Sequence, residues 1–168
     1  MQRTSFEQWN CPIARTLDIV GEWWTPLVVR DLAIGISRFD SLQSNLGVSR
    51  KVLTQRLAKL REHGIVERRP YQHNPVRYDY RLTEKGDELA IVLLAMQSWG
   101  VRWLVGDEGP PLVMRHEPCG EITEPVVACS HCREPLRREE LTPLPGPGAM
   151  AGPGTSGVRE ALIRLRQD

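Results

Sequence analysis

The stretch of residues 47–80 constrains the fold most, because it combines a helical repeat, a stop signal and an alternating pattern. Ser49 is suited to cap a helix, and Gly64 is suited to end it because glycine accepts a positive φ. Between them, apolar residues recur at the spacing of one helical face, at Leu53, Leu57 and Leu60. The pattern predicts a helix that buries one side and exposes the other.

Two short strands are predicted to follow this helix, at residues 65–69 and 76–82. In the second segment apolar and charged residues alternate, with Tyr78, Tyr80 and Leu82 on one face and Arg77, Asp79 and Arg81 on the other. Asn74 and Pro75 are typical of the turn between two strands. The segments therefore predict a β-hairpin.

Three helices are predicted to precede this unit, because start and stop signals bracket residues 11–21, 25–35 and 37–47. The third is expected to begin at Ser37, with Asp40 three residues later and Gly47 as its end. A helix that meets the next helix across residues 47–48 forms a helix-turn-helix. The fold class is therefore mainly α with a small β-hairpin wing, an α+β winged helix-turn-helix.

A long helix is predicted from Thr83, because apolar residues return to one side over about twenty residues. These residues are Leu89, Val92, Leu93, Met96, Trp99 and Trp103. The stripe is wider than a small three-helix core needs, which favours a homodimer interface formed by Val92, Met96, Trp99 and Trp103. The alternative is that the stripe packs on the first helix of the same chain.

Positive charge is concentrated in residues 50–81, where nine Lys or Arg residues outnumber three Asp or Glu residues. The net charge there is +6, so the rest of the chain carries −5 to reach the total of +1. A basic helix followed by a basic hairpin is typical of a protein that binds double-stranded DNA. The predicted DNA-binding residues are Ser49, Arg50, Lys51, Thr54, Gln55 and Lys59 of the helix, and Arg68, Arg69, His73 and Arg77 of the hairpin. The alternative is a solvated basic face without a partner.

The chain shows neither a signal peptide nor a membrane span, since its first ten residues are polar and its longest apolar run, residues 89–96, is short. We therefore expect a cytoplasmic, nucleoid-associated protein without a membrane partner. In that compartment its four cysteines are expected to bind metal or to undergo redox chemistry rather than to form structural disulfides.

Three of the cysteines lie close together with a histidine, in the pattern H-x2-C-x9-C-x2-C. Two close pairs joined by a loop can surround tetrahedral Zn²⁺, which predicts a structural zinc site in a zinc-ribbon-like or zinc-knuckle appendage. The predicted ligands are His116, Cys119, Cys129 and Cys132. His131 is an alternative to His116, and three reduced thiols in a mobile tail are an alternative to any metal site.

With these elements placed, the sequence resembles a known family. The segments CPIARTLDIVGEWWTPLVVRDL, SRFDSLQSNLGVSRKVLTQRLAKLREHGIVERRPY and PVRYDYRLTEKG resemble the HxlR family of bacterial transcriptional regulators, whose architecture is MarR-like. The resemblance covers residues 10–105. It implies a winged-helix homodimer that binds a pseudo-palindromic operator, and it leaves the last third of the chain to be interpreted separately.

The resemblance also bears on Cys11, which stands alone at a predicted helix N-terminus. Unpaired backbone N–H groups there favour a thiolate and raise its reactivity. Several family members sense quinones, aldehydes or oxidants through a cysteine near this position. Redox sensing by Cys11 and simple packing of a small side chain both remain open.

The predicted organisation has four parts. Residues 8–105 form the DNA-binding and dimerisation domain, 106–142 the zinc-ribbon-like extension, 143–157 a Pro/Gly linker and 158–168 a short amphipathic helix. The predicted function is a transcriptional regulator, expected to be a repressor, that an electrophile, an oxidant or a small-molecule effector releases from its operator. The alternatives are a zinc-containing adaptor for another protein and, more remotely, a CxxC thiol oxidoreductase.

Overall fold

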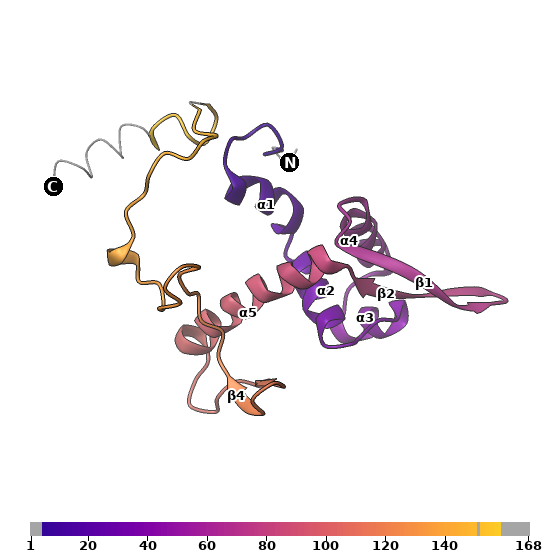
Figure 1. Cartoon of the computed structure of the whole chain (residues 1–168). Helices are drawn as coiled ribbons and strands as arrows, with labels where there is room; N and C mark the ends of the chain where they lie inside the picture. The colour runs from indigo at the N-terminus through magenta and orange to yellow at the C-terminus, as the bar shows by residue number, and fades with distance from the viewer. Residues whose placement is uncertain (1–4, 151, 159–168) are drawn as a thin grey trace. The chain divides into compact units, whose positions relative to one another are not determined.

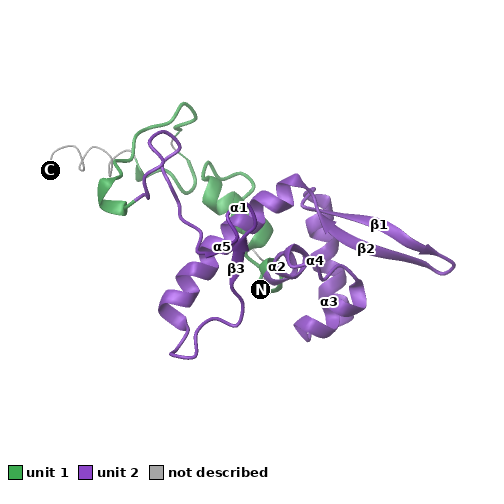
Figure 2. Ribbon diagram, turned by 60° about the horizontal axis from the view of Figure 1, so that its bottom comes forward, with its two compact units in different colours: residues 1–26, 137–168 green, residues 27–136 purple. Residues whose placement is uncertain are grey.

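The structure is a computed structural model, and it describes residues 5–150 and 152–158. The chain divides into two compact units, coloured separately in Figure 2. The larger unit comprises residues 27–136, and the smaller one joins residues 1–26 to residues 137–168.

The order of elements confirms the predicted winged helix-turn-helix (Figure 1). The helices are α1 (Pro12–Val20), α2 (Trp24–Ala33), α3 (Phe39–Leu46), α4 (Arg50–Glu62) and α5 (Glu84–Leu104). The strands are β1 (Val66–His73), β2 (Val76–Leu82), β3 (Met114–His116) and β4 (Glu121–Thr123), and a 3-10 helix spans Arg138–Glu140. β1 extends four residues beyond its predicted end at residue 69.

The core of the larger unit lies where α2, α3 and α4 meet, and its central side chains have no exposed surface. These residues are Val28, Val29, Leu42, Leu53 and Leu60. Burial of each such aliphatic side chain contributes about 1.5–3 kcal/mol to folding. Because Leu53 and Leu60 stand on the predicted apolar face of α4, the core fixes which face of α4 points outward.

The hairpin formed by β1 and β2 is antiparallel, with Val66 opposite Leu82 at its base. It projects away from the three helices (Figure 1). The segment before α3 is joined to β2 by an isolated antiparallel bridge between Arg38 and Asp79, and the backbone N–H of Tyr80 donates to Ser37 O over 2.8 Å. The wing is therefore tied to the helix-turn-helix through its backbone.

Ser37 does not cap α3, contrary to the sequence-based expectation. The N-cap of α3 is Arg38, which makes no side-chain cap hydrogen bond. The hydroxyl of Ser37 donates instead to Asp79 Oδ1 on β2, over 3.4 Å. The prediction was wrong because this side chain is recruited by a strand that lies 42 residues away in sequence.

The start of α5 is fastened to the end of α4. The hydroxyl of Thr83 accepts from the N–H of Gly86 over 3.3 Å, capping α5, and donates to Gly64 O over 2.7 Å. Gly86 lies so close to Ile65 O that a Cβ atom would clash with this oxygen. Within the described part of the chain, no helix has the length and apolar character needed to cross a membrane.

The smaller unit brings its two chain segments together around Trp9. The ring of Trp9 packs edge-on against Phe6, with centroids 4.9 Å apart, and lies against Gly154. Asn10 Nδ2 donates to Gly148 O over 2.9 Å. The Pro/Gly stretch 143–157 therefore contacts residues 9–10. The helix predicted for residues 158–168 falls outside the described residues, apart from Val158.

Candidate nucleic-acid interface and cysteine turns

The exposed face of α4 is set by the cap and the core. Ser49 Oγ accepts from the N–H of Val52 over 3.3 Å, which starts the helix as predicted. The three leucines of α4 are buried, so the side chains on the opposite face point to solvent. Exposed on this face are Arg50, Lys51, Thr54 and Gln55, as the sequence predicts for a recognition helix.

Lys59 differs from the other predicted residues of α4, because its side chain is half-buried. It stands between Leu57 and Leu60, at the border of the apolar face. Lys59 is therefore a flanking residue of the exposed face rather than a central one.

Arg50 is held by neighbours on α3. Its guanidinium lies 4.7 Å from the centre of the Phe39 ring, and its Nη1 atom lies 3.7 Å from Asp40 Oδ1. Both charged side chains remain largely exposed, so the ion pair is weak. These contacts hold Arg50 at the junction of α3 and α4, where the motif meets solvent.

The wing carries exposed basic side chains along its length. Those predicted to contact DNA are Arg68, Arg69, His73 and Arg77, and all four are exposed. The guanidinium of Arg68 lies 4.3 Å from the centre of the Tyr78 ring, and Arg69 Nη2 pairs with Glu67 Oε1 over 2.6 Å. Tyr78 is half-buried, which agrees with a packing role for this tyrosine.

A buried carboxylate, Asp31, joins α2 to α3 and was missed by sequence reasoning. Asp31 has no exposed surface, and its Oδ1 atom accepts from Arg30 Nη2 over 2.6 Å. Its Oδ2 atom accepts from Asn45 Nδ2 over 2.7 Å. The sequence carries no signal for this role, because an acidic residue near the end of a helix is usually solvated.

The apolar face of α5 carries exposed side chains in the larger unit. Val92, Met96, Trp99 and Trp103, the four residues predicted to form a dimer interface, are between 55% and 67% exposed. Ile91 and Leu104 of the same helix are exposed as well. An apolar surface of this size is characteristic of a surface that another molecule covers.

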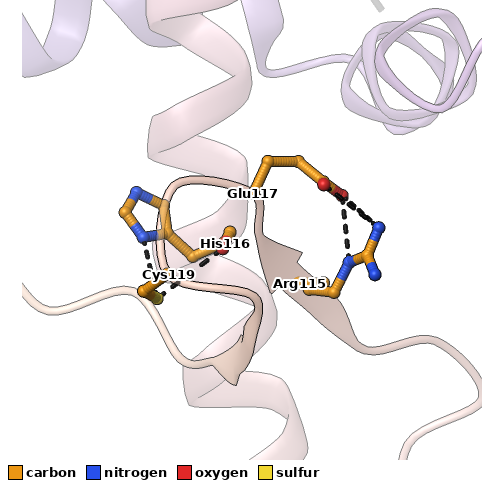
Figure 3. Close-up of polar contacts among 4 residues, drawn as sticks. All are labelled: Arg115, His116, Glu117 and Cys119. Carbon is orange, nitrogen blue, oxygen red and sulfur yellow. Dashed lines mark hydrogen bonds and ion pairs between the residues drawn. The ribbon is translucent and has the colours of Figure 1, made fainter.

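His116 and Cys119 lie together in the turn between β3 and β4 (Figure 3). His116 Nδ1 lies 3.2 Å from Cys119 Sγ. On the other side of the turn, Arg115 Nη2 contacts both carboxylate oxygens of Glu117, over 2.9 and 3.0 Å. The turn thus brings two of the four predicted zinc ligands side by side.

Cys129 and Cys132 form a second pair. The backbone N–H groups of Cys132 and then His131, together with the Cys132 thiol, hold the pKa of the Cys129 thiol below its ordinary value. Across the residues that the structure describes, no three His, Cys, Asp or Glu side chains gather where one metal ion would bind. The four predicted ligands are therefore present as two pairs and not as one cluster.

Cys11 is the N-cap residue of α1 and has extended backbone angles. Its thiol is free, partly exposed and makes no side-chain cap hydrogen bond. The position agrees with the predicted helix N-terminus.

Comparison with known proteins finds one matching family, and the similar proteins are named as transcriptional regulators. The sequence model of the family described as HxlR-like helix-turn-helix matches residues 19–108. An uncharacterized HTH-type transcriptional regulator of Mycobacterium tuberculosis H37Rv, Rv3095, is 42% identical over 139 residues, which cover 83% of this chain and 88% of that protein. The similarity to Rv3095 therefore extends beyond the winged-helix region.

Solved structures of transcriptional regulators resemble the chain as well. PA1607, described as a candidate transcription factor, superposes with a TM-score of 0.72 at 32% identity and covers 82% of this chain and 96% of its own. The reduced form of the redox regulator HypR superposes with a TM-score of 0.51 at 32% identity, covering 54% of this chain and 90% of its own. With the basic helix-turn-helix described above, these matches show that the chain belongs to the HxlR-like helix-turn-helix family and is a DNA-binding transcriptional regulator, not an enzyme.

Proposed function

We propose that this regulator binds an inverted-repeat operator as a homodimer, acts as a repressor on nucleoid DNA in the cytoplasm, and is released by an electrophile, an oxidant or a small-molecule effector. The observation that carries the proposal is the exposed basic surface formed by α4 and the wing, within a helix-turn-helix whose core fixes the outward face of α4. The zinc-containing adaptor is the weaker alternative, because it leaves the charge of +6 unexplained.

The two basic elements suit different parts of a duplex. The N-terminal half of a recognition helix reaches base edges in the major groove, where Arg50 can bind guanine and Gln55 can bind adenine in a bidentate manner. The wing residues, such as Arg77, suit the phosphate backbone or the minor groove. Recognition by α4 would therefore set sequence preference, and the wing would set affinity.

Two recognition helices are needed for an inverted repeat, and the exposed face of α5 supports the second copy. The face is apolar, so the same face of a symmetry-related α5 could pack against it and cover it. Its four predicted interface residues are more than half exposed within one chain. A dimer joined there would remove this surface from water.

Selection from random duplex DNA at two salt concentrations tests the proposal directly. We expect an inverted-repeat motif that persists at the higher salt, because base contacts depend less on salt than phosphate contacts do. Arg50→Ala is expected to cost about 1–3 kcal/mol and to relax the preference at one position of each half-site.

Arg77→Ala is expected to weaken binding to specific and random DNA alike and to reduce the salt slope by about 1. Arg15→Ala, an exposed arginine of α1, serves as the matched control and should leave binding unchanged. The proposed division of roles fails if Arg50→Ala and Arg77→Ala lower affinity without any change in sequence preference. Binding that high salt abolishes, without a motif, would contradict the operator itself.

Release through Cys11 is supported by its free, partly exposed thiol and by the likeness to the redox regulator HypR. The thiolate would add to a ring carbon of a quinone, forming one C–S bond as the C=C π bond of that carbon opens toward the carbonyl oxygen, and the adduct takes up the proton that the thiol lost. Modification there would change the spacing of the two recognition helices. The exposed face of α5 is the place where a small-molecule effector would act instead.

Cys11→Ser is expected to bind the operator and to stay bound when a quinone is added. The matched control replaces the other three cysteines by serine and should still be released. Release of Cys11→Ser at the wild-type quinone concentration would exclude Cys11 from the mechanism.

A further inference from the structure

The two cysteine-containing turns share one backbone design, although they lie in different parts of the extension. In the first turn, the N–H of Gly120 donates to His116 O over 2.8 Å; in the second, the N–H of Arg133 donates to Cys129 O over 3.0 Å. In both turns the potential ligands stand at positions 1 and 4, and the hydrogen bond joins position 5 to position 1. Short antiparallel segments flank each turn, β3 with β4 around the first and the Ala128–Pro135 bridge around the second.

The fifth residue of each turn has the left-handed conformation. Gly120 has a φ of 78°, and Arg133 has a φ of 66°. Arg133 is the single residue other than glycine with a positive φ among the described residues. A side chain in this conformation costs about 1–2 kcal/mol, so the turn holds Arg133 in it against its own preference. Such strain is expected where a backbone must aim two side chains at one ligand.

The two side chains of the first turn already lie close enough to share an ion. His116 Nδ1 and Cys119 Sγ are 3.2 Å apart, whereas adjacent nitrogen and sulfur ligands of tetrahedral zinc lie about 3.6 Å apart. In the second turn, the backbone N–H of Cys129 donates to Glu134 O over 2.8 Å, which pairs the two segments that flank the turn.

The extension also lacks a hydrophobic core that would hold it in shape. Most of its apolar side chains are exposed, with Ile122 at 63%, Val126 at 63% and Val127 at 62%. A segment this small that buries so little apolar surface usually needs a metal or a disulfide to stay folded. All four cysteines of the chain are free thiols.

From these observations we propose that the two turns are the halves of one structural zinc site, in which His116, Cys119, Cys129 and Cys132 close around a single Zn²⁺. The nine residues between Cys119 and Cys129 form the loop that lets one turn fold onto the other. The two pairs are separate in the structure, so binding of the ion and closure of the extension occur together. Four protein ligands leave no position for water, so the ion stabilises the extension and does not catalyse a reaction.

The shared backbone design also favours His116 over His131 as the fourth zinc ligand. His116 occupies position 1 of the first turn, which corresponds to Cys129 in the second. His131 occupies position 3 of the second turn, and no residue type capable of binding zinc stands at the equivalent position of the first, which is Pro118. His116 is therefore the fourth ligand.

Metal content of the reduced full-length protein, equilibrated with Zn²⁺ and then dialysed, tests the site. About one zinc per chain is expected, with Co²⁺ in its place giving the visible absorption of a tetrahedral thiolate site. Cys129→Ser, Cys132→Ser and His116→Ala should each lose most of the metal. Cys11→Ser and His131→Ala are the matched controls and should retain it.

Two further measurements test the site without a cysteine variant, which could unfold. In the wild-type chain, Zn²⁺ should slow backbone hydrogen exchange in both turns at once, since one ion joins them. Arg133→Gly should retain full metal content, because it removes strain without removing a ligand. The proposed site would be overturned by the absence of bound zinc or by one zinc per two chains. Protection of one turn alone would also overturn it, as would metal loss in His131→Ala with retention in His116→Ala.

Discussion

At the scale of single residues, Arg50 has two partners inside its own chain before any DNA is present. Asp40 and Phe39 hold its guanidinium at the junction of α3 and α4. The sequence predicts that Arg50 is exposed, since it stands opposite the leucine face. It does not predict the ion pair, because the rotation of α3 relative to α4 decides which acidic residue comes near.

The ion pair leads to a prediction for Asp40→Asn. Removing a carboxylate beside Arg50, the arginine proposed to contact bases, should increase operator affinity by about two- to fivefold at low salt, because the negative charge repels phosphates. Stability should change by less than about 1 kcal/mol, since the pair is exposed. Fluorescence anisotropy with labelled operator measures the affinity. Asp107→Asn, an exposed residue outside the motif, is the control, and weaker binding of Asp40→Asn would show that Asp40 orients Arg50 productively.

Asp31 leads to a prediction on stability. Asp31→Ala leaves Asn45 and Arg30 without their buried acceptor, which should lower the free energy of unfolding by about 1–3 kcal/mol. Urea unfolding followed by circular dichroism measures the loss. Asp87→Ala, an exposed substitution in the first turn of α5, should cost less than about 1 kcal/mol. Equal stability of the two variants would contradict a structural role for Asp31.

At the scale of elements, the helices are predicted well where their signals are local. Ser49 caps α4 and Thr83 caps α5 through side-chain hydrogen bonds to residues three positions later, and such bonds depend only on neighbouring sequence. Ser37 has the same side-chain chemistry, yet it bonds to β2 instead of capping α3. The difference arises because a distant strand offers Ser37 a competing acceptor.

Gly86 carries the sharpest prediction at this scale. Gly86→Ala puts a Cβ atom against the backbone oxygen of Ile65, where neither group can move without displacing α5 from the end of α4. We expect a loss of stability of about 2 kcal/mol or more, although alanine favours a helix over glycine by about 1 kcal/mol. Thermal unfolding measures the change, with Glu88→Ala on an exposed position of α5 as the control. An increase in stability would show that the close approach is relieved at little cost.

At the scale of the whole molecule, the exposed face of α5 predicts dependence of DNA binding on assembly. Trp103→Glu places a charge on a side chain that is 67% exposed in the single chain, so the fold should tolerate it. A dimer formed through this face should dissociate, because burying the carboxylate is costly.

Sedimentation velocity should therefore show a monomer for Trp103→Glu, with operator affinity lower by about a hundredfold or more because the two half-sites are no longer bound together. Arg102→Ala, an exposed neighbour on α5, is the control and should remain a dimer. Unchanged far-ultraviolet circular dichroism would show that the chain still folds. A variant that stays dimeric at micromolar concentration would place the interface elsewhere.

The sequence alone determined the features that depend on neighbouring residues. The period of the leucines sets the buried side of α4, and the caps and glycines set most helix ends. The excess of Lys and Arg predicts that α4 and the wing are the elements that bind DNA. The tertiary structure alone decided which distant groups meet: Asp31 with Asn45, Ser37 with β2, Gly86 with Ile65, and the common backbone design of the two cysteine turns. The physical reason is that periodicity and capping are set within a few residues, whereas these contacts depend on packing angles and chain reversals that no local pattern encodes.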